Sequence, residues 1–128
     1  LMNIVLWIVQ GLLALAFLAA GFMKLATPID ELAANMAWAA DVPSLLVRFI
    51  GLAEVLGAIG LIVPAVTRIR PHLTPMAALG IIAIMVLAAI FHPTRGEGSM
   101  VMPNIFMIAM AGFVYYGRTK LAPISPTS

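Results

Sequence analysis

The stretch FIGLAEVLGAIGLIVP, residues 49–64, is an apolar run that contains several glycines and a single carboxylate, Glu54. Such a run is typical of a transmembrane helix, in which a charged side chain near the bilayer centre costs roughly 3 kcal/mol or more. A group of this kind usually faces the interior of a helix bundle and meets a partner there. The stretch therefore predicts a membrane protein in which Glu54 points inward toward another helix.

The whole chain shares this apolar character. Of its 128 residues, 63% are hydrophobic and only 9% are charged, and the mean hydropathy is +1.12. A soluble domain of this size would expose a very large apolar surface. The 7 Lys and Arg residues are scattered and form no basic patch for nucleic acid, and the absence of Cys excludes disulfides and thiolate metal sites. The composition predicts an integral membrane protein that contacts the lipid bilayer.

Four apolar stretches approach the length of about 20 residues that a helix needs to cross a membrane. No segment alternates polar and apolar residues as a membrane barrel strand does. The fold class we expect is all-α, an integral membrane four-helix bundle forming a single domain over residues 1–120, with a disordered tail over 121–128. The expected spans are residues 3–25, 44–65, 73–92 and 101–118.

The segment between the first two spans, TPIDELAANMAWAAD, has a different pattern. Thr27 is a candidate N-cap, Pro28 suits the first helical position, and acids follow in the first turn. Apolar residues then recur at helical spacing, although the segment is too short to span a membrane. It predicts a short amphipathic helix that lies on the bundle or in the membrane interface.

The distribution of Lys and Arg between the loops predicts the orientation. Arg68, Arg70, Arg118 and Lys120 fall on one face without nearby acids, whereas the basic residues of the other face stand among acids. The first span lacks a basic segment before it and a cleavage site after it, so we expect it to be retained rather than removed as a signal peptide. Both termini are predicted to lie in the cytoplasm.

With that topology, each span contributes one polar residue to the non-cytoplasmic half of the bundle. These residues are Lys24, Glu54, His92 and Asn104. Lys24 can reach inward on its long stem and pair with Glu54 across the first two helices. Gly21, Gly51 and Gly57 lie beside these charges and allow close helix packing. Lys24 also belongs to an inward stripe of the first span that has helical spacing: Gln10, Ala14, Phe17, Gly21 and Lys24.

Three of these polar residues also have a purely structural interpretation. Lys24, near a helix end, can extend to the membrane interface, and His92, next to Pro93, can be an interfacial loop residue. Asn104 can be a hydrogen-bonding contact between helices. A metal site is not expected, because His72 and His92 fall at opposite ends of one predicted helix.

The chain resembles the DoxX-like family of small four-helix membrane proteins. The resemblance is carried by FLAAGFMKL with Gly21 and Lys24, by the opening stretch with Glu54, by AAIFHP with His92, and by Asn104. It covers almost the entire chain and implies that Lys24, Glu54, His92 and Asn104 form the polar site. It also implies a bacterial inner membrane and kinship with small subunits of quinone-linked oxidoreductases, although relatives with thiols carry cysteines that this chain lacks.

Two classes of function follow from these observations. In the first, the polar pocket holds a quinone headgroup, Glu54 and His92 exchange protons with it, and electrons come from a redox partner protein. The chain is then not a complete enzyme alone. In the second, the protein is a scaffold, assembly factor or lipid-binding module, and the Lys24 and Glu54 pair fixes the helix register. A transporter is disfavoured because the chain has no internal repeat, unless it forms a homo-oligomer.

Overall fold

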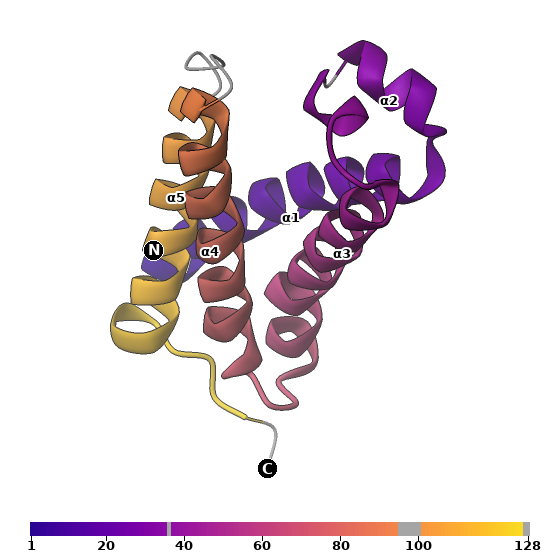
Figure 1. Cartoon of the computed structure of the whole chain (residues 1–128). Coiled ribbons are helices and arrows are strands. Elements are labelled where there is room, and N and C mark those ends of the chain that lie inside the picture. The colour runs from indigo at the N-terminus through magenta and orange to yellow at the C-terminus, as the bar shows by residue number, and fades with distance from the viewer. Residues whose placement is uncertain (36, 95–100, 127–128) are drawn as a thin grey trace.

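The computed structural model describes residues 1–35, 37–94 and 101–126, without the side chains of residues 35, 37, 38 and 92–94. Every regular element in the described residues is helical, as Figure 1 shows, which confirms the all-α prediction. The elements, in chain order, are α1 (Met2–Ala26), α2 (Ile29–Asn35), η1 (Ala37–Ala40), α3 (Ser44–Thr67), α4 (Leu73–Thr94), α5 (Val101–Tyr116) and η3 (Gly117–Leu121).

Three helices of the described chain are long and apolar enough to cross a membrane: α1, α3 and the Leu73–Phe91 part of α4. The fourth predicted span corresponds to α5, which has 16 residues. At a rise of about 1.5 Å per residue it is shorter than the bilayer core. It continues without interruption into the π-helical segment η3 of 5 residues, so the helical rod extends to Leu121. The protein is therefore a multi-pass membrane protein built from three long apolar helices and a C-terminal helix.

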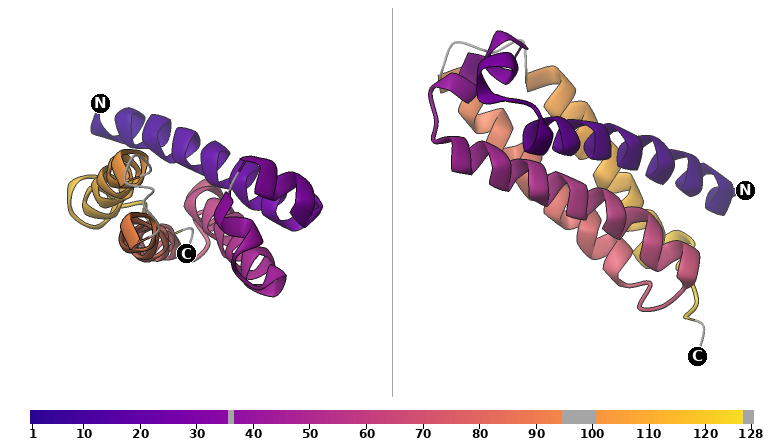
Figure 2. Two further views of the ribbon diagram at one scale, coloured as in Figure 1. Left: turned by 45° about the horizontal axis from the view of Figure 1, so that its top comes forward. Right: turned by 90° about the vertical axis from the view of Figure 1, so that its right-hand side faces the viewer.

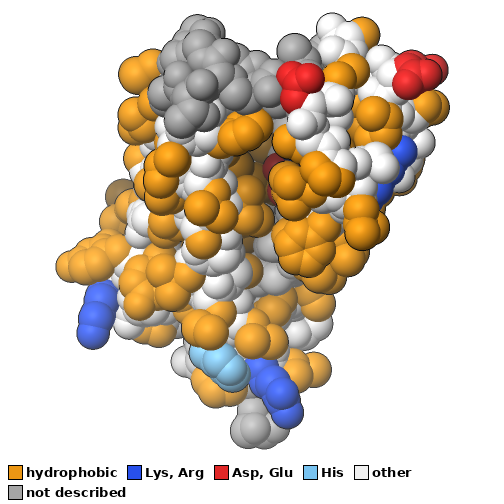
Figure 3. Space-filling model, viewed as in Figure 1, with side chains coloured by type: hydrophobic (Ala, Val, Ile, Leu, Met, Phe, Trp, Pro, Cys, Tyr) orange, Lys and Arg blue, Asp and Glu red, His pale blue; other side chains and the backbone are white. Residues whose placement is uncertain are grey.

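The long helices pack as two pairs, α1 with α3 and α4 with α5, and the contact between α3 and α4 joins the pairs. Figure 2 shows this arrangement from two further directions. The outward faces carry large apolar side chains such as Leu15, Phe49 and Leu87, and Figure 3 shows hydrophobic side chains over most of one face. A surface of this kind suits lipid rather than water as the surrounding solvent.

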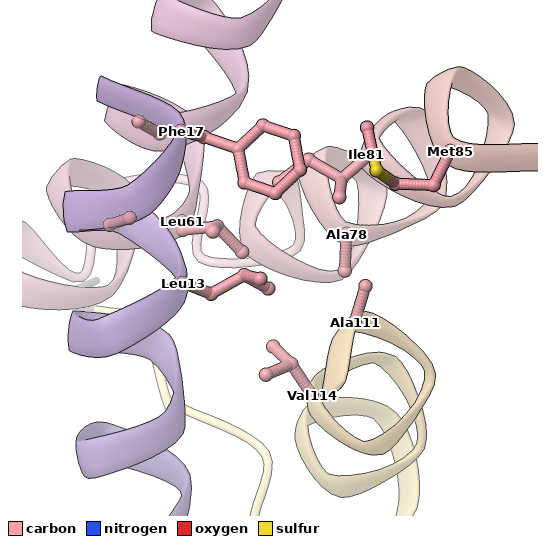
Figure 4. Close-up of a cluster of buried hydrophobic side chains, with 10 residues drawn as sticks. Leu13, Phe17, Leu61, Ala78, Ile81, Met85, Ala111 and Val114 are labelled. Atoms are coloured by element: carbon pink, nitrogen blue, oxygen red, sulfur yellow. The ribbon is translucent and has the colours of Figure 1, made fainter. Parts of the chain in front are cut away.

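The centre of the bundle is a cluster of apolar side chains to which all four long helices contribute. Figure 4 shows these side chains pointing toward one another from α1, α3, α4 and α5. The small side chains of Ala78 on α4 and Ala111 on α5 allow close packing at this point. The cluster consists of Leu13, Ala14, Phe17, Ala58, Leu61, Ala78, Ile81, Met85, Ala111 and Val114.

Pro64 lies inside α3 and has no N–H group to donate to the carbonyl of Gly60, four residues earlier. The hydroxyl of Thr74 in α4 donates to that carbonyl oxygen at 3.1 Å. Gly60 also permits the close approach of α4, because a Cβ atom there would lie 2.8 Å from Cβ of Ala77. The hydrogen bond that Pro64 cannot donate is thus replaced by one from the neighbouring helix.

The predicted short helix between the first two spans is present as α2, followed by the 3₁₀ turn η1. Leu32, Ala39 and Val47 form a small buried cluster that holds this segment against the start of α3. Thr27, predicted as the N-cap of the short helix, instead ends α1, where its N–H donates to the carbonyl of Met23. The chain therefore leaves α1 and enters α2 with almost no loop.

Candidate functional site

Lys24 of α1 and Glu54 of α3 form an ion pair in the interior of the bundle. Nζ of Lys24 lies 2.7 Å from Oε1 of Glu54, and the side chains are only 10% and 4% exposed. Lys24 and Glu54 both belong to the buried faces of their helices. The predicted contact is therefore present, with each charge neutralised by a partner inside the apolar part of the molecule, as such groups require.

Two glycines bring the backbones of α1 and α3 together next to this pair. A Cβ atom on Gly21 would lie 2.6 Å from the carbonyl oxygen of Gly51, and one on Gly51 would lie 2.8 Å from the carbonyl oxygen of Gly21. Any larger residue would force the helices apart. Gly57 is less constrained, because its added Cβ would meet Cγ1 of Ile81 at 3.2 Å. The sequence pattern of small residues thus sets the short distance between α1 and α3.

Arg48 fixes the end of α1 that carries Lys24. Its Nη1 donates to the carbonyl oxygens of Lys24 at 2.6 Å and of Thr27 at 2.7 Å. The last carbonyls of a helix have no partner within the helix, so these bonds act as a cap supplied by α3. From the sequence, Arg48 is only one of the basic residues of the non-cytoplasmic face, but its position near the start of α3 lets its long side chain reach the end of α1.

A cavity of about 170 Å³ adjoins the ion pair. Phe17 and Met85, which point into the centre of the bundle in Figure 4, form part of its wall. Glu54 and Asn104 supply the polar groups of an otherwise apolar lining. The lining residues come from all four long helices: Ala16, Phe17, Ala20, Glu54, Met85, Pro103, Asn104 and Met107.

Asn104 lies in the first turn of α5, and its Nδ2 atom is buried without a hydrogen-bond partner in the described part of the structure. An amide donor in that condition costs about 1–3 kcal/mol relative to a satisfied one. The cavity beside it is the place where an acceptor atom of a ligand would satisfy it. Glu54 offers carboxylate oxygens on the same cavity, so the site presents one donor and one acceptor around an apolar space.

The other two predicted site residues, Lys24 and His92, are not among the residues that line the cavity in the described structure. Lys24 does not line the cavity but lies behind Glu54, on the α1 side of the ion pair. His92 lies in the last turn of α4, and its side chain is outside the described residues. Its participation in the site stays a prediction. The structure thus brings Lys24, Glu54 and Asn104 to one region of the bundle.

A second buried polar cluster, not expected from the sequence, lies toward the opposite end of α1. Gln10, which is fully buried, donates from Nε2 to the carbonyl oxygen of Leu61 at 2.7 Å and accepts at Oε1 from Nε of Arg118 at 2.6 Å. Arg118 was interpreted only as a charge marking the orientation. Gln10 belongs to the predicted inward stripe of α1, and a buried amide side chain needs hydrogen-bond partners, so the sequence did indicate that a polar group lies near it.

Comparisons with known proteins agree with this architecture. A family model described as the DoxX-like family matches residues 8–114, which include all of α3 and α4 and most of α1 and α5. Searches of curated proteins and of solved structures find no match. The match takes in Lys24, Glu54 and Asn104 together with the helices that position them. The chain belongs to the DoxX-like family.

Proposed function

We propose that this protein is a small membrane subunit that holds the headgroup of a quinone in the cavity between Glu54 and Asn104. The observation that carries the proposal is Asn104, a residue that lines the cavity and whose Nδ2 is buried without a partner in the described structure. Quinones dissolve in the bilayer and carry carbonyl oxygens on a flat ring. Such an oxygen is the acceptor that the amide needs.

The dimensions and lining of the cavity support a ring-sized ligand. Its volume is about 170 Å³, and an engineered apolar cavity of about 150 Å³ in another protein accommodates benzene. Phe17, Met85 and Met107 provide aromatic and polarizable contacts for a ring. The polar groups are few and lie on separate helices, which is typical of sites that fix a ligand's orientation.

In this role each polar residue has a distinct task. Asn104 donates a hydrogen bond to one ring oxygen, and Glu54 exchanges a proton with the ligand. Lys24 holds the carboxylate of Glu54 in place through the 2.7 Å ion pair. His92 is proposed as a second proton-exchanging group, in keeping with the chemistry of imidazole.

A bound quinone supplies two-electron redox chemistry, and this chain contributes only the binding site and protons. The electrons come from a partner protein, so the chain acts as one subunit of a quinone-linked oxidoreductase. We also propose a bacterial inner membrane as its location. A cytoplasmic position of both termini is supported by Arg68, Arg70, Arg118 and Lys120, which lie at or after the predicted cytoplasmic ends of the second and fourth spans.

A second candidate function is a scaffold or assembly factor in which the ion pair is purely structural. It is favoured by the enclosure of the pair between two helices that are already in backbone contact at Gly21 and Gly51. Buried ion pairs of this type fix the register of one helix against another. In that case Asn104 and the cavity have no ligand.

Saturable binding of decylubiquinone to the purified protein tests the first function. We expect the parent chain to bind and both Asn104→Leu and Glu54→Gln to lose about tenfold in affinity, the effect of one lost hydrogen bond. Glu31→Gln, on an exposed acid of α2, is the matched control and should bind like the parent. Lys24→Met should weaken binding while the far-ultraviolet helix signal is retained.

Absence of saturable binding by the parent chain contradicts the quinone site. If Lys24→Met and Glu54→Gln then unfold at lower temperature than Glu31→Gln, the scaffold function is supported instead. Equal binding by the parent and by Asn104→Leu would also count against the cavity, because the ligand would then lie elsewhere on the protein.

A further inference from the structure

Arg118 carries a buried positive charge without an acidic partner. The residue is 4% exposed, and its hydrogen bonds reach only neutral acceptors on Gln10, Asn3 and Ala122. Within the described residues no carboxylate forms a salt bridge with it, and its Nη2 atom has no partner there. Burial of a guanidinium without a counter-ion is unfavourable, so the surrounding region favours an anion.

A groove of about 590 Å³ lies beside this charge, at the end of the bundle opposite to Glu54. It shares three residues with the surroundings of Arg118: Asn3 and Ala122, which accept from its Nη1, and Trp7, whose ring centroid lies 5.4 Å from the guanidinium carbon. Arg68, at the end of α3, is the arginine that lines the groove itself, whereas Arg118 lies next to its lining residues. Two positive charges therefore act on one recess.

The groove combines these charges with apolar walls. Val66 and Ile124 line it together with Trp7 and Arg68, and Val66 is 63% exposed on the outer face of α3. In Figure 3 basic and histidine side chains lie at the lower end of the molecule without acids nearby, whereas a basic side chain at the upper right lies near the acids. The groove thus lies where the apolar helices end and basic residues begin, the level of lipid headgroups.

We infer that this groove binds the phosphate of an anionic phospholipid, with the acyl chains lying along the apolar face of α3. Arg68 contacts the phosphate, and Arg118, from behind Asn3 and Trp7, contributes its charge through the groove wall. A free phosphate ion would use the charges but leave the apolar walls exposed. Basic recesses between membrane helices commonly hold anionic headgroups in this way.

Native mass spectrometry of the full chain, released from micelles that contain phosphatidylglycerol or phosphatidylcholine, tests the inference. We expect retention of phosphatidylglycerol in preference to phosphatidylcholine. Arg68→Gln should weaken retention about fivefold, the loss of one basic contact near a membrane surface. Arg70→Gln is the matched control, because both arginines have positive φ angles, 57° and 50°, but Arg70 does not line the groove. The control should retain the lipid like the parent.

Three results would overturn the inference: equal retention of the two lipids, equal effects of Arg68→Gln and Arg70→Gln, or displacement of phosphatidylglycerol by inorganic phosphate at millimolar concentration. The last result would assign the groove to a soluble anion. Arg118→Lys provides a second test that keeps the charge, and it should retain phosphatidylglycerol more strongly than Arg118→Gln. None of these readouts depends on quinone binding at the other end of the bundle.

Discussion

The backbones of Gly21 and Gly51 are in direct contact, since a Cβ on either residue would lie within 2.8 Å of the carbonyl oxygen of the other. We expect Gly21→Ala or Gly51→Ala to separate α1 from α3 and to lower the free energy of unfolding by about 1–3 kcal/mol, the usual cost of overpacking. Gly11→Ala is the control, because nothing lies within 4 Å of its added Cβ. Equilibrium unfolding in detergent micelles measures the difference, and equal stabilities of Gly11→Ala and Gly21→Ala would disprove the close contact.

The ion pair between Lys24 and Glu54 gives a second prediction. Lys24→Met leaves the buried carboxylate of Glu54 without its partner, which should destabilise the protein by about 3–5 kcal/mol. The double variant Lys24→Met with Glu54→Leu removes both charges and should recover most of that loss. Unfolding titrations of the parent, the single variant and the double variant measure the coupling, and additive losses would show that the charges do not interact.

Removal of the hydroxyl of Thr74 tests the compensation for Pro64. Thr74→Val deprives the carbonyl of Gly60 of its donor, and we expect a loss of about 1 kcal/mol. Thr119→Val is the control, since the hydroxyl of Thr119 is bonded to the carbonyl of Tyr115 in its own helical turn. Thermal unfolding should show a larger decrease for Thr74→Val, and the reverse order would be inconsistent with the bond from α4.

Asn104 and Asn3 should respond in opposite ways to the same substitution. Asn104→Leu removes an amide whose Nδ2 is buried without a partner, so stability should rise by about 1 kcal/mol or more. Asn3→Leu removes an acceptor for Arg118 and should lower stability. An increase in stability with a loss of ligand affinity at Asn104 is the usual mark of a binding residue, whereas a destabilised Asn104→Leu would indicate a structural role.

The bundle and its inward faces could be predicted because hydrophobic length and helical periodicity are local properties of the sequence. All five residues of the predicted stripe on α1, from Gln10 to Lys24, are buried. The Lys24–Glu54 contact followed from the cost of a lone charge in lipid and from the glycines beside it. The extra residues of α3 and α4 beyond the predicted ends are the ordinary uncertainty of helix boundaries.

The polar cluster around Arg118 could not be predicted, because the bond from Arg118 to Gln10 joins residues 108 positions apart. A basic residue after the last apolar run is usually interfacial, and only the tertiary arrangement turns it inward. The polar residues of the pocket could be predicted, but its size and apolar lining could not, since the empty space results from how Phe17, Met85 and Met107 pack between the helices.

Lys24 is attached to α3 twice, through its ammonium group to Glu54 and through its carbonyl oxygen to Arg48. Any tilt of α1 relative to α3 would have to break both attachments and separate the glycine backbones at the same time. We therefore expect these two helices to behave as one rigid unit. If a ligand in the cavity beside Glu54 requires any helix adjustment, we expect it in α4 and α5 rather than between α1 and α3.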